Sequence, residues 1–86
     1  MHTVELLEQA IVVARDLGFD VRHDWLGGEG SGHCLLRGRK ILLLDLAQSP
    51  VEQLDAVRDA LRGEIHISRM DMPTELADTL DVRSVA

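Results

Sequence analysis

The chain has 86 residues, of which 45% are hydrophobic, and carries a net charge of -6 with an isoelectric point near 5.0. This length supports one domain with a single core and excludes a deep cleft between two lobes. The acidic balance opposes a phosphate backbone, and Phe19 and Trp25 are the only aromatic stacking residues, so we expect no nucleic-acid binding. With one cysteine, no basic-then-apolar leader and no apolar run of about 18 residues, we expect a cytoplasmic protein without membrane contact.

The first element is an amphipathic helix over residues 3–17, because its apolar residues recur at helical spacing. These residues are Val4, Leu6, Leu7, Ala10, Ile11, Val13, Ala14 and Leu17. We expect Thr3 to cap this helix and Gly18 to end it in a left-handed conformation. From Phe19 to Leu26 apolar and polar residues alternate, which predicts a half-buried strand.

A glycine-rich loop follows this strand. Its residues Gly28, Gly30, Ser31 and Gly32 lie beside the only cysteine, Cys34. One interpretation is a pliable connector between strands, and the other is a ligand loop whose backbone N–H groups converge on an anion. A strand rather than a helix follows, and the lysine of a phosphate-binding loop is missing, so the connector is favoured.

Two further strands are expected over residues 33–37 and 40–46, joined by a type II′ turn at Gly38-Arg39. This turn places Leu36 opposite Ile41 and Cys34 opposite Leu43. The run Ser49-Pro50-Val51-Glu52 predicts a helix start with a capping box, and Gly63 predicts its end. We expect a short fourth strand at residues 65–67, a brief helix opened by Pro73, and a frayed tail at 81–86.

These elements predict one two-layer α+β domain over residues 1–86: a helix, a three-stranded antiparallel meander, a helix, a short strand and a short helix. The expected register puts one set of side chains under the two long helices: Phe19, Val21, Trp25, Cys34, Leu36, Ile41 and Leu43. The opposite face then carries four leucines that would be exposed to solvent in a two-layer domain: Leu35, Leu42, Leu44 and Leu46. Leaving them exposed would lose the stabilisation that burial gives and would favour association, so we expect another layer to bury them. Two covers are open: a C-terminal segment containing Met70, Met72, Leu76 and Leu80, or a second copy of the chain.

Cys34 and His23 form the best candidate for a nucleophile and its base, because the expected register puts them diagonally across a strand pair. The same register buries Cys34 under the helices, which favours an inert thiol. Arg37, Arg39 and Lys40 form a basic group at the hairpin, either as a solvated turn or as a site for an anion or an acidic partner. The four histidines are scattered and lack metal-ligand spacing, so we expect no metal and no cofactor.

The run from Gly32 to Asp45, followed by Gln53-Leu54 on a helix, resembles the hairpin-to-helix region of ImmA/IrrE-type zinc peptidases. Those enzymes carry H-E-x-x-H on that helix, where this chain reads Gln53-Leu54-Asp55-Ala56-Val57-Arg58. With those ligands missing, the resemblance implies no peptidase activity and no site here. The chain is also similar to small bacterial proteins that share its glycine-rich loop and Gly-Arg hairpin, which implies no function.

The favoured hypothesis is a non-enzymatic protein-association module that forms a homodimer through Leu35, Leu42, Leu44 and Leu46. The alternative is a small thiol-dependent or anion-binding enzyme centred on the Gly27–Gly32 loop, with Cys34 as nucleophile and His23 as base. A third hypothesis is a regulatory domain that binds a small anionic ligand at Arg37, Arg39 and Lys40.

Overall fold

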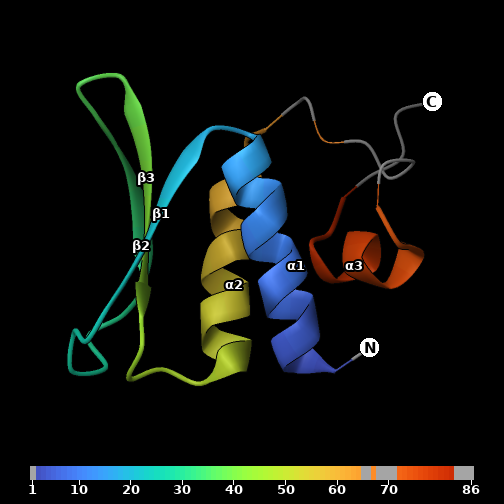
Figure 1. Cartoon of the computed structure of the whole chain (residues 1–86), viewed down its shortest axis with the longest axis horizontal. Helices are drawn as coiled ribbons and strands as arrows, with labels where there is room; N and C mark the ends of the chain where they lie inside the picture. The colour runs from blue at the N-terminus through green and yellow to red at the C-terminus, as the bar shows by residue number, and fades with distance from the viewer. Residues whose placement is uncertain (1, 65–66, 68–71, 83–86) are drawn as a thin grey trace.

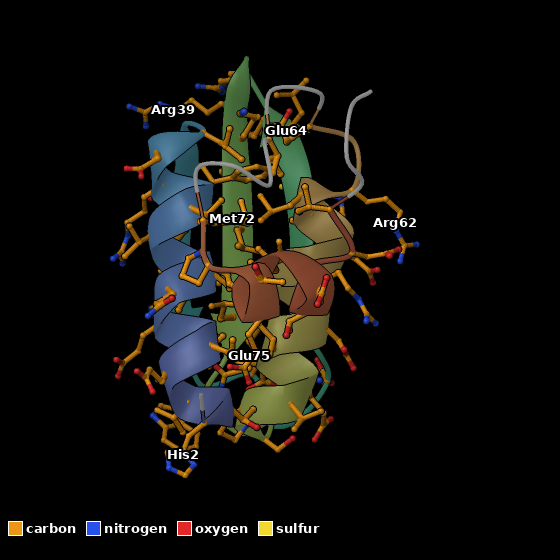
Figure 2. The ribbon with its side chains drawn as sticks, turned by 90° about the vertical axis from the view of Figure 1, so that its right-hand side faces the viewer. His2, Arg39, Arg62, Glu64, Met72 and Glu75 are labelled. Atoms are coloured by element: carbon orange, nitrogen blue, oxygen red, sulfur yellow. The ribbon has the colours of Figure 1, made fainter. Side chains whose placement is uncertain are left out.

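The computed structural model describes residues 2–64, 67 and 72–82. Its elements are α1 (Thr3–Asp16), β1 (Phe19–Asp24), β2 (Gly32–Leu36), β3 (Arg39–Asp45), α2 (Pro50–Leu61) and α3 (Thr74–Thr79). Helices α1 and α2 lie side by side against one face of a three-stranded sheet (Figure 1). Helix α3 lies across the side of this helix pair that faces away from the sheet (Figure 2). The predicted α+β class is therefore confirmed.

Local sequence signals set most helix ends. Ser49 accepts a hydrogen bond from the backbone of Glu52, whose side chain accepts one from the backbone of Ser49, so the predicted capping box starts α2. Gly18 has a φ of +94°, the left-handed stop expected after α1. The expected cap at Thr3 is wrong, because Thr3 is already helical and His2 precedes the helix without a side-chain capping bond.

The order of the strands differs from the expected meander. The sheet has the order β1-β3-β2, with β1 parallel and β2 antiparallel to β3. The segment from residue 25 to 31 carries the chain past the end of β3 to its far side. The physical reason lies in β3, whose run from Ile41 to Leu44 is apolar on both sides and gains most from a neighbour on each edge. The more polar β1 and the short β2 become the edges.

The hairpin between β2 and β3 turns at Arg37-Gly38, one residue earlier than predicted. Both residues have positive φ, +51° and +78°, which is the type I′ geometry rather than type II′. Leu36 therefore lies opposite Arg39, and Cys34 lies opposite Ile41 instead of Leu43. The pairing is therefore shifted by two residues. Because side chains alternate between the faces with a period of two, the residues expected to share a face of the hairpin still share one.

The helices cover the opposite face of the hairpin from the expected one, whereas Phe19 and Val21 of β1 lie on the helix side as expected. Leu42 and Leu44 are both 0% exposed and lie in the core under α1 and α2. The parallel register places Val21 beside Leu42, and thus brings the apolar side of β1 onto the leucine side of β3. The expected set under the helices is therefore wrong for Cys34, Leu36, Ile41 and Leu43, which share the open face of the sheet. It is also wrong for Trp25, which follows β1 and is 72% exposed.

The C-terminal part of the chain does not cover the open sheet face where the structure describes it. Met72, Leu76 and Leu80 pack against the core from the helix side, as does Val82. Of the predicted fourth strand only Ile67 is described, and it belongs to no strand. Met70 and most of the predicted tail fall outside the described residues.

Candidate functional site

The glycine-rich loop is held by a buried carboxylate at the end of β3. Asp45 is 0% exposed, and its carboxylate accepts hydrogen bonds from the backbone N–H groups of Leu26, Gly30 and Ala47 at 3.0, 3.3 and 2.9 Å. Its own backbone N–H donates to Ser31 Oγ at 2.8 Å. Backbone N–H groups that could have bound an external anion thus already have an internal acceptor.

Burial has the largest effect on Asp45 and by itself raises the pKa of that carboxyl. The backbone hydrogen bonds from Ala47, Leu26, Gly30 and Gly28 together outweigh it, so that the pKa lies below the ordinary value of 3.8. A second acceptor, Gln48 Oε1, receives hydrogen bonds from the Ser31 backbone and hydroxyl at 3.1 and 2.7 Å. The loop is therefore closed on the chain itself, which favours the connector interpretation. Nothing in the local sequence pattern marks Asp45 or Gln48 as an acceptor for this loop, because both lie more than ten residues further along the chain.

The structure does not bring Cys34 and His23 together. Cys34 is exposed on β2, so its expected burial is wrong. His23 lies on β1 opposite Leu44, with β3 between it and β2. A thiol and an imidazole on opposite edges of a sheet cannot act as nucleophile and base on one substrate atom.

The three basic residues of the hairpin do not form one cluster. Arg37 and Arg39 are exposed at the turn. Lys40 is turned to the helix side, where its Nζ donates to the carbonyl of Leu17 at 2.5 Å and forms an ion pair with Glu64. Lys40 therefore binds the end of α1 rather than a ligand at the hairpin.

Strand β2 is an exposed edge of the sheet. All five of its residues are exposed, with Leu35 at 71% and Leu36 at 56%. One side pairs with β3, and no strand among the described residues pairs with the other. The two residues that flank a two-residue turn, here Leu36 and Arg39, form a hydrogen-bonded pair. Along an antiparallel ladder, hydrogen-bonded pairs alternate with pairs that exchange no hydrogen bonds and whose N–H and C=O groups point away from the partner strand. The backbone N–H and C=O groups of His33 and Leu35 therefore point outward from the free edge.

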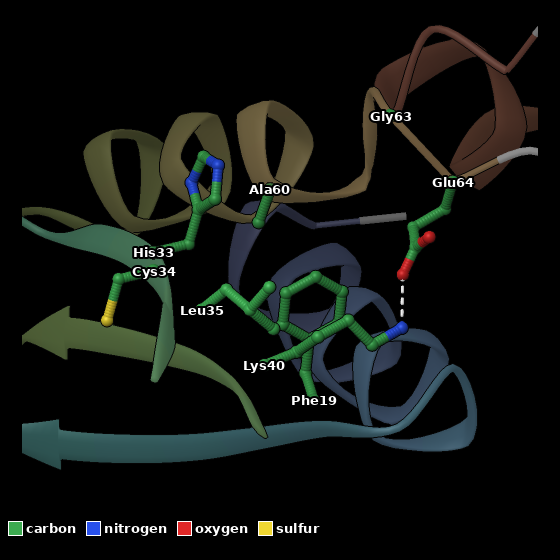
Figure 3. A pocket seen from close by; sticks show the side chains of 8 residues that line it. All are labelled: Phe19, His33, Cys34, Leu35, Lys40, Ala60, Gly63 and Glu64. Atoms are coloured by element: carbon green, nitrogen blue, oxygen red, sulfur yellow. Dashed lines mark hydrogen bonds and ion pairs between the residues drawn. The ribbon is translucent and has the colours of Figure 1, made fainter. Parts of the chain in front are cut away.

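A hollow of about 240 Å³ lies beside β2 and the end of α2 (Figure 3). Its lining residues are Phe19, His33, Cys34, Leu35, Lys40, Ala60, Gly63 and Glu64. His33 points toward α2 near Ala60, while Cys34 points to the other side of the sheet (Figure 3). The hollow and the free edge of β2 thus adjoin and form one surface, which we call the β2 edge surface.

No helix in the described part of the chain is long and apolar enough to cross a membrane. Within residues 2–64, 67 and 72–82, no group of three or more His, Cys, Asp or Glu side chains is placed to hold a metal ion. No family model matches the chain, and comparisons with curated proteins and with solved structures give no match.

Proposed function

We propose that this chain is a non-enzymatic cytoplasmic protein-association module that forms a homodimer through the β2 edge surface. The observation that carries the proposal is that all five residues of β2, including two leucines, are exposed on an edge with outward backbone groups that no described strand pairs. An edge of this kind is a template for another strand, and proteins that do not use such an edge blunt it with charge, proline or a bulge. None of the residues of β2, Gly32 to Leu36, is charged or a proline.

This surface replaces the leucine set expected from the sequence. Leu42 and Leu44 belong to the core, so they offer nothing to a partner. Leu35 remains exposed on β2, and Leu46 lies beyond the end of β3. Association through the sheet is retained as the function, but the proposed contact moves from its face to its edge.

The competing hypotheses have less support. A thiol-dependent enzyme needs Cys34 beside a base, and His23 lies at the opposite edge of the sheet. An anion-binding loop needs free N–H groups, and those of Leu26, Gly30 and Ser31 have acceptors within the chain. The resemblance to zinc peptidases adds no site, because the sequence of α2 lacks the H-E-x-x-H ligands and reads Gln53-Leu54-Asp55-Ala56-Val57-Arg58 instead.

Light scattering coupled to size-exclusion chromatography, over a range of protein concentrations, tests the proposal. We expect the wild-type protein to have the mass of a dimer. Leu35→Glu places a charge on the free edge and should give a folded monomer, because an unpaired carboxylate opposes burial at the contact. Val12→Glu is the matched control, since Val12 is 54% exposed on α1, the helix that packs on β1 at the opposite edge of the sheet from β2. This variant should remain a dimer.

A wild-type protein that stays monomeric at every concentration would overturn the proposal. So would a Leu35→Glu protein that keeps the dimer mass. Circular dichroism of both variants shows that the fold is retained, and separates loss of association from unfolding.

A further inference from the structure

Resting on the proposed self-association, we infer that two copies pair β2 with β2 in antiparallel fashion, with the two Cys34 residues facing each other on the two-fold axis. The two three-stranded sheets then form one continuous six-stranded sheet. The occupant of the β2 edge surface is thus a second copy of this chain. The register follows from three features of the edge: its hydrogen-bonding groups, its side chains and its charges.

The hydrogen-bonding groups restrict the register. His33 and Leu35 present their backbone N–H and C=O groups outward, while Gly32, Cys34 and Leu36 direct theirs to β3. An isologous contact centred on Cys34 places His33 of each copy opposite Leu35 of the other. The outward backbone N–H and C=O groups of His33 in each copy then form hydrogen bonds with those of Leu35 in the other. Cys34 becomes a pair without mutual hydrogen bonds, in which the two Cα atoms lie about 4.5 Å apart.

The side chains fit this arrangement. Leu36 of one copy lies opposite Gly32 of the other, where there is no side chain to compete for space. On the helix side, Leu35 of one copy lies opposite His33 of the other. Leu35 is 71% exposed in the single chain and lies next to the hollow that Ala60 also lines. Pairing therefore covers the most exposed leucine of β2 on an apolar surface.

The charges are also self-complementary. Continuing the same register beyond the strand, Arg37 of one copy lies opposite Ser31 of the other, close to Glu29. The turn is basic, with Arg37 and Arg39, whereas the loop before β2 carries the acidic Glu29. Two-fold symmetry repeats this match at both ends of the contact, and no residue of β2 itself carries an Asp, Glu, Lys or Arg side chain that could repel its copy.

Oxidative cross-linking of the native protein tests the register, because Cys34 is the only cysteine. Diamide takes up the two electrons and two protons released when two thiols form a disulfide. A Cα separation of about 4.5 Å falls within the range that a disulfide spans. We expect the wild-type dimer to be converted to a covalent dimer, seen by intact mass under non-reducing conditions.

The matched control moves the thiol by two residues on the same side of β2. In the double variant Cys34→Ser and Leu36→Cys, the two thiols lie at opposite ends of the contact, and cross-linking should be at least about tenfold slower. Two other registers pair only part of the free edge, with His33 facing His33 or Leu35 facing Leu35. They place Cys34 opposite Gly32 or Leu36, so they predict no disulfide for the wild-type protein.

Charge reversal gives a second readout that does not involve the thiol. Glu29→Lys and Arg37→Glu should each weaken the dimer by about two- to fivefold, and the two changes together should restore it. Additive weakening in the double variant contradicts the proposed register.

The Cys34→Ser protein separates the two proposals, since it cannot be cross-linked. If Cys34→Ser is a dimer by light scattering but wild-type Cys34 does not cross-link, self-association stands and the register is overturned. If the wild-type protein and Cys34→Ser are both monomers at every concentration, both proposals fail. A dimer that cross-links rapidly through Cys34, and slowly through the moved thiol, supports both.

Discussion

The backbone N–H of Asp45 donates a hydrogen bond to Ser31 Oγ at 2.8 Å and thereby joins the last residue of β3 to the loop that leads into β2. The same Asp45 accepts hydrogen bonds from Leu26 and Gly30 in that loop. One buried residue thus holds the crossing segment that allows β3 to lie between β1 and β2. This segment leads directly into β2, the exposed edge strand.

Asp45→Asn should destabilise the fold. The amide replaces one carboxylate oxygen with a donor that faces backbone N–H groups, so at least one of them loses its acceptor. We expect a fall in the melting temperature of several degrees, measured by differential scanning calorimetry. Asp24→Asn is the control, because Asp24 is exposed. Among the described residues its carboxylate accepts a local hydrogen bond from the Trp25 backbone, so the substitution should change the melting temperature little.

Asp45 should also make stability depend on pH in the acid range. Its pKa is lower in the folded chain than the ordinary value of 3.8, so folding favours the ionised form. The stabilisation is complete above 3.8 and is lost as the pH falls through the lower folded-state pKa. The difference in free energy of unfolding between wild type and Asp45→Asn, from urea titrations, should therefore shrink with acidification. A difference that stays constant down to the acid limit contradicts this role.

Leu42→Ala should cost about 2–5 kcal/mol of unfolding free energy, because Leu42 is fully buried under the helices and its truncation leaves a cavity. Val12→Ala, on an exposed face of α1, should change the stability by no more than about 0.5 kcal/mol. Denaturant unfolding measures both. A small effect of Leu42→Ala on stability, together with loss of the dimer, would instead place Leu42 in the contact between copies.

Gly38→Ala should destabilise the hairpin by about 1 kcal/mol, because Gly38 has a φ of +78° in the type I′ turn. The cost is one of backbone conformation, since a Cβ added there meets no atom within 4 Å. Gly63→Ala is matched to it: a Cβ at Gly63 also meets open space, but the backbone φ is not positive. Thermal unfolding should show a loss for Gly38→Ala and no loss for Gly63→Ala.

Lys40→Met should lower stability by about 1 kcal/mol, because Lys40 donates to the carbonyl of Leu17 just after α1 and pairs with Glu64 just after α2. Arg39→Met, one residue earlier on the exposed turn, should have less effect. Part of the Lys40 effect should disappear at high salt, which screens the ion pair but leaves the hydrogen bond to Leu17. Equal losses for the two variants would show that Lys40 has no special role.

The sequence by itself determined the features that depend on neighbouring residues. Ser49 and Glu52 start α2, and Gly18 ends α1, because capping and left-handed stops are satisfied within a few residues. The alternation along the hairpin also grouped Leu35 with Leu42 correctly, since strand periodicity fixes which side chains share a face.

Only the tertiary structure decided which face the helices cover and which strand became an edge. Placing β3 between β1 and β2 depends on contacts between segments far apart in the chain, among them those of Asp45 with the loop from Leu26 to Ser31. Periodicity is the same whichever face is buried, so it could not assign Leu42 to the core or Cys34 to the surface. The β2 edge surface could not be predicted for the same reason. The expected meander made β2 the central strand, and whether a strand is at an edge depends on which strands pair with it in the folded sheet.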